Sequence, residues 1–315
     1  MGNMTKPIHL PVMAEEVVKF LATDHEGTYL DLTVGLGGHL KALAEATGPN
    51  ARLYGLDKDP ETVKLAVKNL AGYGQVKKVA RASFCDLESV MDGVGVKTFN
   101  GILLDLGLSS YQLDDPHRGF SFRLDGPLDM RFDPQSKSKT AADLVNTLSE
   151  EELTEIIRSF GEERRARKIA RTIVRKREKV AVQTTKQLAD IVTNVAPPPH
   201  QKKSIARVFQ AFRIAVNHEL EQLQRVLPLA LTWLKIEGRL AILSYHSLED
   251  RIVKRFIQQE AKGCTCPPGL PQCICGATSR LRILTPKAMT PKQREKDQNP
   301  RARSAKLRVA KKIAA

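Results

Sequence analysis

Short apolar runs alternate with helical patterns over the first 110 residues of the chain. The runs at 29–32, 52–56 and 101–105 are typical of buried strands, and a weaker run lies at 78–81. After the second run, Asp59 is a candidate helix N-cap and Pro60 a first helical residue. Strands that alternate with helices predict an α/β fold, with a parallel sheet covered by helices on both faces.

The next sheet-like run, 239–243, follows more than 130 residues after Asp105. Between them, Ser149 and Glu152 form a capping box, and helical patterns cover 162–177, 184–195 and 205–227. A crossover in an α/β sheet usually takes about 30 residues. We therefore expect a helical domain inserted between two strands of one sheet. The predicted division is 1–113 with 214–315 for the sheet domain, and 114–213 for the inserted domain.

The C-terminal part continues the sheet pattern. Ser247 is the expected N-cap of a helix after the returning strand. Two short β-like runs, 281–284 and 306–309, are expected to complete the sheet as an antiparallel edge pair.

Composition restricts the class of protein. A chain of 315 residues with 42% hydrophobic residues can bury a sizeable core. No apolar run approaches the ~18 residues of a membrane span, and the first residues show no secretory pattern. We expect a cytosolic protein whose five cysteines form no disulfide framework.

Positive charge is concentrated in two blocks. The net charge of +15 arises from +8 over 137–213 and +13 over 251–315, on a neutral to acidic remainder. Such blocks favour a polyanionic partner, nucleic acid first, because neutralised phosphates release counterions. The helix expected over 162–177 carries eight of these cations: Arg164, Arg165, Arg167, Lys168, Arg171, Arg175, Lys176 and Arg177. One side of it could pair with Glu162 and Glu163 while another meets phosphate; the alternative is a solvated basic surface.

The stretch from Asp31 to His39 has the pattern of a nucleotide-binding turn. An acidic strand end precedes Gly35, Gly37 and Gly38, and a helix begins behind them. Leu40 stands where the dinucleotide fingerprint needs its third glycine, so a diphosphate is disfavoured. Asp57, at the end of the second strand, can accept hydrogen bonds from ribose hydroxyls. The pattern predicts an adenosine cofactor without a diphosphate, such as S-adenosylmethionine; the alternative is a packing turn followed by helix caps.

Four cysteines, Cys264, Cys266, Cys273 and Cys275, have the number required for a tetrahedral zinc site. Their C-x-C spacing is tighter than the usual C-x₂-C, and reduced thiols in a loop are the alternative. We include no metal among the predicted sites, and we expect Cys85 to be a small buried residue.

Several separated motifs resemble those of the bacterial 16S ribosomal RNA cytosine-N4 methyltransferases, the RsmH/MraW family. They are 9–13, the Gly-Gly-His loop, 105–114, 118–122, 129–131, 213–220, 244–251 and 299–304. The resemblance covers nearly the whole chain. It implies a Rossmann-like class I S-adenosylmethionine-dependent methyltransferase sheet with an inserted all-helical domain.

The resemblance also assigns residues to the cofactor site. It implies that Gly37, Gly38 and His39 line the cofactor, that Asp57 holds the ribose and that Phe84 packs on the adenine. Asp105 and Gln112 would close the site near the sulfonium. The full predicted cofactor set is Asp31, Gly35, Gly37, Gly38, His39, Asp57, Phe84, Asp105 and Gln112.

The proposed chemistry requires a hydrogen-bond acceptor, because the cytosine amine is a weak nucleophile. Asp105 is the candidate acceptor, with the Ser109 hydroxyl or a loop carbonyl assisting. Many nucleic-acid amino-methyltransferases carry two prolines and an aromatic residue here, whereas this chain has Asp-Leu-Gly-Leu-Ser-Ser at 105–110. His246 has two open interpretations, facing the substrate base or acting as a cap.

The resemblance therefore predicts methylation of the N4 amine of a cytidine in the decoding region of 16S ribosomal RNA. The expected partner is the small ribosomal subunit, with no membrane and no DNA. The alternatives are a methyltransferase of this fold that acts on DNA or protein, and an RNA-binding ribosome-assembly factor with a vestigial cofactor pocket.

Overall fold

The computed structural model describes residues 11–92, 94–263, 266, 275 and 278–314. It divides the chain into two compact units. The first, here the sheet unit, comprises Met1–Gly107 and Gln222–Ala315, and the second, the helical unit, comprises Leu108–Glu221. The stretch 114–213 of the sequence prediction lies inside the helical unit, which extends further at both ends.

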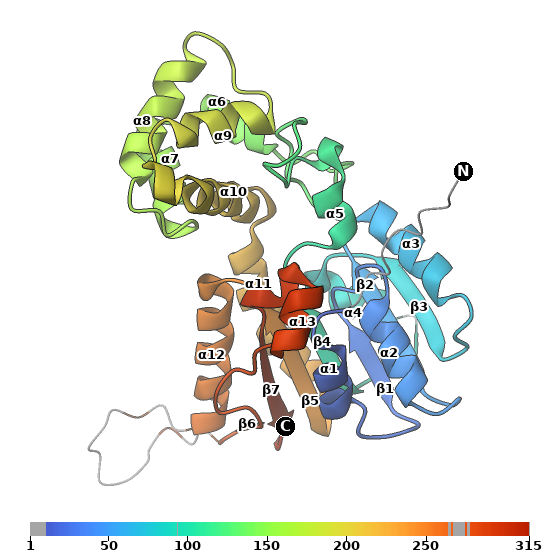
Figure 1. Cartoon of the computed structure of the whole chain (residues 1–315). Coiled ribbons are helices and arrows are strands. Elements are labelled where there is room, and N and C mark those ends of the chain that lie inside the picture. Colours follow the sequence, from blue (N-terminus) through green and yellow to red (C-terminus); the bar gives the residue numbers. More distant parts are fainter. Residues whose placement is uncertain (1–10, 93, 264–265, 267–274, 276–277, 315) are drawn as a thin grey trace. The chain divides into compact units, whose positions relative to one another are not determined.

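The sheet unit contains, among the described residues, a seven-stranded sheet in the order β3-β2-β1-β4-β5-β7-β6 (Figure 1). The strands are β1 (Thr28–Asp31), β2 (Arg52–Asp57), β3 (Val76–Arg81), β4 (Phe99–Asp105), β5 (Leu234–Ser244), β6 (Leu281–Ile283) and β7 (Lys306–Lys312). The first five pair in parallel, and β7 pairs antiparallel with β5 and with β6. The predicted α/β class, the parallel sheet and the antiparallel edge pair are confirmed.

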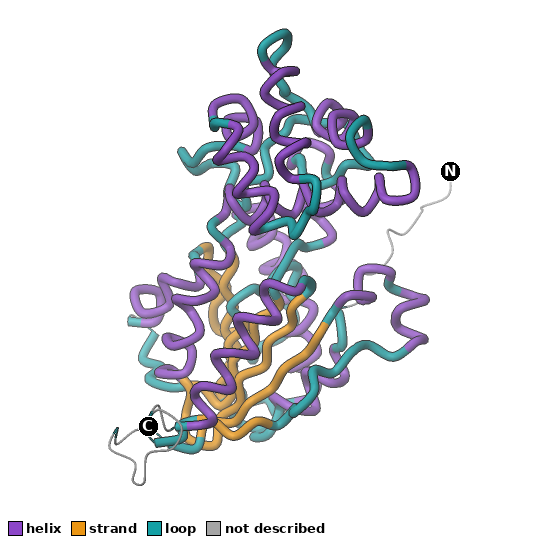
Figure 2. Tube along the Cα trace, turned by 90° about the vertical axis from the view of Figure 1, so that its left-hand side faces the viewer, coloured by secondary structure: helices purple, strands orange, loops and turns teal. Residues whose placement is uncertain are grey.

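Helices cover both faces of this sheet (Figure 2). They are α1 (Ala14–Leu21), α2 (Gly38–Ala46), α3 (Pro60–Leu70), η1 (Phe84–Asp86), α4 (Leu87–Met91), α11 (Glu219–Trp233, which begins in the helical unit), α12 (Ser247–Lys262), α13 (Gln293–Gln298) and η4 (Pro300–Ser304). Successive residues of a strand point to opposite faces. Leu103 of β4 accordingly packs with residues of α1, α2 and α3, whereas Leu104 packs with residues of α4, α11 and α12.

The strand order reverses beside β1. The chain runs outward from β1 through β2 to β3, and then crosses to the other side for β4 and β5. In open parallel sheets, ligands bind beyond the carboxyl ends of the strands at such a reversal. The ends of β1 and β4 therefore mark where a site is expected.

The helical unit has a core of its own. Its elements are α5 (Ser110–Asp114), η2 (Pro116–Arg118), α6 (Ala141–Thr147), α7 (Glu150–Ser159), α8 (Ala166–Arg177), α9 (Thr185–Thr193), η3 (Pro198–His200) and α10 (Gln201–Asn217). Leu153, Ile169 and Phe212, from three different helices, are fully buried in that core. The predicted capping box of α7 is confirmed: Ser149 Oγ accepts the N–H of Glu152, and Glu152 Oε2 accepts the N–H of Ser149.

The structure gives different bounds for one predicted helix and divides another helical pattern in two. The helix expected over 162–177 begins only at Ala166, because Glu162 has a φ of 49° and the Glu163 carboxylate accepts the N–H of Arg165. The pattern over 205–227 is two helices, since His218 at the end of α10 has a φ of 52°. Among the described residues, none of the helices has the length and apolar character needed to span a bilayer.

Candidate functional site

Three aspartates end adjacent strands of the sheet unit. Asp31 is the last residue of β1, Asp57 of β2 and Asp105 of β4. Because β1 lies between β2 and β4 and all three run parallel, their carboxylates stand at one edge of the sheet. This edge is the candidate site.

Thr33 connects two of these strand ends. Asp31 Oδ1 accepts hydrogen bonds from the Thr33 N–H at 3.0 Å and from the Thr33 hydroxyl at 3.3 Å. The N–H of Asp105 in turn donates to Thr33 Oγ1 at 2.6 Å. Asp31 Oδ2 is buried and has no hydrogen-bond partner within the described residues. A buried carboxylate oxygen without a donor is costly unless a ligand supplies one.

Asp57 organises the turns around it. Its Oδ2 accepts the N–H of Gly35 at 2.9 Å, and its Oδ1 accepts the N–H of Asp59 at 3.0 Å. Asp59 in turn caps α3, as its sequence position predicted. Each Asp57 oxygen keeps a second lone pair, so the carboxylate is fixed in place and can still accept hydrogen bonds from a diol.

His39 is a buried residue at the start of α2. Its Nε2 lies 3.0 Å from the carbonyl oxygen of Val12. Since a carbonyl can only accept, Nε2 carries the proton, and Nδ1 of the neutral ring is a lone-pair nitrogen. Nδ1 lies 3.6 Å from Asp105 Oδ2, which is too long for a hydrogen bond.

Burial changes the acidity of all these groups. Loss of solvent raises the pKa of Asp31 to about 7, that of Asp57 to about 6 and that of Asp105 to about 7. Burial also lowers the pKa of His39, which favours its neutral form. Three carboxyl groups that titrate close to neutral pH at one edge are typical of a functional site.

Tyr245 is a residue of this edge that the sequence analysis missed. It directly follows β5, and its hydroxyl donates a hydrogen bond of 2.7 Å to Asp105 Oδ1. The sequence contained a usable signal, because Tyr245 stands in the motif 244–251 directly after a strand. The position after a strand points to Asp105 only when β5 is known to pair with β4.

His246 acts as a helix cap, which is one of the two interpretations that the sequence left open. It is the N-cap of α12, where its Nδ1 accepts the N–H of Glu249 at 3.4 Å. The prediction that Ser247 is the cap was therefore wrong. Ser247 is the first helical residue, because the imidazole one position earlier supplies the acceptor.

Backbone conformation favours glycine at two positions of the turn, and close packing favours it at the third. Gly35 and Gly37 have φ values of 53° and 88°, which side chains rarely adopt. A Cβ on Gly37 would stand 2.9 Å from the Leu70 side chain, and one on Gly38 would stand 3.1 Å from Pro11. Gly37 and Gly38 thus allow close packing of the loop against α3 and the N-terminal segment.

Phe84 lies at the same edge of the sheet. It begins η1 behind β3 and packs half-buried on the core. The N–H of Ala82 donates to the carbonyl of Asp57 at 2.9 Å, so the segment that leads to Phe84 runs beside the end of β2.

Ser109 and Gln112 belong to the helical unit, in which they cap α5. Ser109 Oγ accepts the N–H of Gln112 at 3.2 Å, and Gln112 Oε1 accepts the N–H of Ser109 at 3.0 Å. The Ser109 hydroxyl is therefore used as a helix cap. Among the predicted site residues, the structure groups Asp31, Gly35, Gly37, Gly38, His39, Asp57, Phe84 and Asp105 in the sheet unit.

Comparison with known proteins identifies the family. The family model described as "MraW methylase family" matches residues 6–313. The chain belongs to this family.

Curated relatives of this MraW-family chain match it over nearly its whole length. The "Ribosomal RNA small subunit methyltransferase H" of Trichlorobacter lovleyi is 48% identical over 308 residues, covering 97% of this chain and 98% of the relative. The proteins of the same name from Pelobacter propionicus and Thermomicrobium roseum are 47% and 48% identical, covering 97% of this chain and 98% and 94% of the relatives. The predicted family, and with it an S-adenosylmethionine-dependent methyltransferase, is confirmed.

The residues at the sheet edge fit S-adenosylmethionine. Asp31 Oδ2 is a buried acceptor without a partner in the described part of the chain, which suits a cationic ammonium group. Asp57 is fixed beside the glycine turn with lone pairs for a ribose diol.

The basic helix α8 belongs to the helical unit of this MraW-family chain. Arg167 and Arg171 approach Glu150 of α7 at 3.8 and 3.4 Å. Glu163, one of the two glutamates with which the helix was expected to pair, is buried and instead approaches Arg207 at 3.6 Å.

The zinc prediction concerns cysteines outside this site. Of the four cysteines considered for zinc, Cys264 and Cys273 lie outside the described residues, so the site stays untested.

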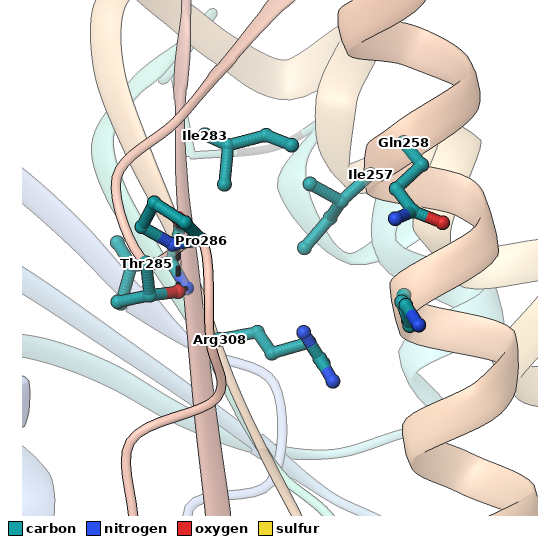
Figure 3. A pocket seen from close by; sticks show the side chains of 8 residues that line it. Ile257, Gln258, Ile283, Thr285, Pro286 and Arg308 are labelled. Carbon is teal, nitrogen blue, oxygen red and sulfur yellow. Dashed lines mark hydrogen bonds between the residues drawn. The ribbon is translucent and has the colours of Figure 1, made fainter.

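A cavity of about 20 Å³ between α12 and the β6–β7 pair has room for a single water molecule (Figure 3). Arg308 in its wall is bonded to Asp250 at 2.7 Å, and the cavity is too small for a nucleoside.

Proposed function

We propose that this enzyme methylates the N4 amine of a cytidine in the decoding region of 16S ribosomal RNA, in the small ribosomal subunit. The observation that carries the proposal is the Asp105 carboxylate. It ends the strand beside β1, its side chain is 22% exposed, and two neighbouring side chains approach its two oxygens. The names of the curated relatives supply the small-subunit RNA as substrate class.

S-adenosylmethionine, when bound, supplies an electrophilic methyl carbon. Asp31 would accept hydrogen bonds from its ammonium group, Asp57 would hold its ribose, and Phe84 would pack on its adenine. Gly35, Gly37, Gly38 and His39 would shape the wall of the site. In this role the glycine turn approaches the cofactor with backbone alone.

Asp105 acts on the amine of the substrate. The lone pair of that amine is delocalised into the ring, and an acceptor on its hydrogens makes it more nucleophilic. As the new carbon–nitrogen bond forms, one amine proton must leave, and Asp105 can take it directly or through water. Alignment of the reacting atoms would supply most of the rate.

We further infer that the sheet unit binds the cofactor and that the helical unit contacts RNA. Arg164, Lys168, Arg175 and Lys176 are exposed along α8 and the turn before it. In the described part of the chain, no ion pair engages these four cations, so they are available to phosphates. The enzyme would then act in the cytosol, where small subunits are assembled.

Labelled methyl transfer tests the proposal. Small subunits from cells without this protein are incubated with the purified protein and methyl-labelled S-adenosylmethionine, and the RNA nucleosides are identified by mass spectrometry. We expect N4-methylcytidine in the decoding region, and Asp105→Asn should reduce its formation by about 100-fold or more. Label in DNA or protein would refute the substrate, and absence of cofactor binding in calorimetry would favour an assembly factor.

A further inference from the structure

Tyr245 reaches Asp105 because of how β5 pairs with β4. In the parallel register Asp105 lies opposite Leu243, so Tyr245 follows just beyond the end of the strand pair. From there its hydroxyl donates to Asp105 Oδ1 at 2.7 Å. The half-buried ring packs on the apolar cluster beneath the site.

The main chain of Tyr245 is itself fixed. Its N–H donates to Glu249 Oε2 at 2.8 Å, and Glu249 is only 3% exposed in the first turn of α12. Glu249 Oε1 lies 3.1 Å from His246 Nε2. The start of α12 therefore determines where the tyrosine ring stands.

Gly107 leaves room for this ring. It has a φ of 106°, and a Cβ there would stand 3.2 Å from a carbon of the Tyr245 ring. That distance is tighter than ordinary contact, so glycine allows the chain that leaves β4 to pass along the ring. The stretch 105–110 contains no aromatic residue, and the ring beside it comes from the neighbouring strand.

Other groups near Asp105 oppose its ionisation or are neutral. Burial and the charge of Glu249 on α12 raise the Asp105 pKa, and the Tyr245 hydroxyl lowers it. Asp31 on β1 is a further carboxylate at this edge, and His39 on α2 is favoured in its neutral form. Burial, with the charges of Asp105, Glu249 and Glu295 on α13, raises the Tyr245 pKa well above its usual value, so Tyr245 remains a donor.

We propose that Tyr245 is a positioning residue whose hydroxyl keeps Asp105 ionised and oriented, so that Oδ2 remains for the substrate amine. The inference rests on the proposed function, since it assigns Tyr245 a part in the same reaction. The residue acts through Asp105.

The test is the pH dependence of kcat for Tyr245→Phe, with small subunits as substrate. Losing the hydroxyl should raise the pH at which Asp105 ionises, so the acid limb of the profile should move upward by about one pH unit. At pH 7 kcat should fall about fivefold, because Asp105 with a pKa of about 7 is half ionised there in the wild type, and it should recover toward wild type at alkaline pH, with KM and cofactor affinity within about twofold. A misfolded protein would not recover in this way.

Two further variants make the test decisive. Tyr73→Phe removes the hydroxyl that bonds Glu45 at the surface and should leave the profile unchanged. Glu249→Gln removes the charge that raises the Asp105 pKa and should move the acid limb downward. Wild-type transfer is measured first: its absence refutes the proposed function, whereas active wild type with an unshifted or uniformly reduced Tyr245→Phe profile refutes the role of Tyr245 alone.

Discussion

The Asp57 carboxylate accepts a hydrogen bond of 2.9 Å from the backbone N–H of Gly35. This interaction joins the end of β2 to the glycine turn that follows β1. A residue expected to hold the ribose therefore also fixes the glycine turn that is expected to line the cofactor.

Asp57→Ala should weaken S-adenosylmethionine binding by about 1–3 kcal/mol, because the variant removes both the charged hydrogen bonds to the ribose and the anchor of the Gly35 turn. Isothermal titration calorimetry measures the change. Glu61→Ala, at the start of the same helix α3, is the matched control and should bind like wild type. Equal affinity of Asp57→Ala and wild type would remove Asp57 from the cofactor site.

Cofactor affinity should fall as the pH is lowered from about 8 to about 5.5, a range that spans the raised pKa values of two carboxyl groups. Asp31 and Asp57 have pKa values raised to about 7 and about 6, and each must be ionised to accept hydrogen bonds from the cofactor. Below its pKa each carboxyl should reduce affinity by up to about tenfold per pH unit. Calorimetry at several pH values checks the slope, and Asp31→Asn should reduce it. A flat profile would show that neither carboxyl ionises on binding.

Lys312 offers a test of the fold that leaves the site untouched. Its buried ammonium group, on β7, donates to the carbonyls of Leu231 and Leu234 at 2.9 Å each. Lys312→Met should lower the free energy of unfolding by about 1–3 kcal/mol, because these carbonyls lose their donor.

Urea denaturation measures this change. The control is Lys311→Met, which removes an ion pair with the exposed Glu237 and should change stability by less than about 1 kcal/mol. Equal stability of the two variants would mean that the Lys312 hydrogen bonds are not formed in solution.

The cations of α8 should determine how RNA binding depends on salt. Replacing Lys168 and Arg175 by Gln should reduce the slope of log affinity against log salt by about 0.7–0.9 for each phosphate that is no longer neutralised. Filter binding to small-subunit RNA over a salt series measures the slope. The control changes Lys64 and Lys68 on α3 of the sheet unit to Gln. If both pairs of substitutions reduce the slope equally, α8 has no special part in binding.

Most strand ends could be predicted because they depend on local pattern. Asp31, Asp57 and Asp105 each end a short apolar run. The spacing of apolar residues and the residues that cap helices can both be recognised within a few positions of the sequence. Tyr245 could not be assigned, because its meaning depends on the pairing of β4 with β5 across the whole helical unit. The start of α8 was placed too early because the inward turn of Glu163 depends on tertiary packing.

The insertion has a consequence for synthesis of the chain. β4 pairs on one side with β1, but its other neighbour, β5, is translated only after all of the helical unit. Until then β4 is an edge strand with unpaired backbone groups, open to wrong partners. The sheet of the N-terminal half therefore cannot be completed until β5 has been synthesised. Rapid folding of the helical unit would shorten this delay, because it brings the ends of the insertion together.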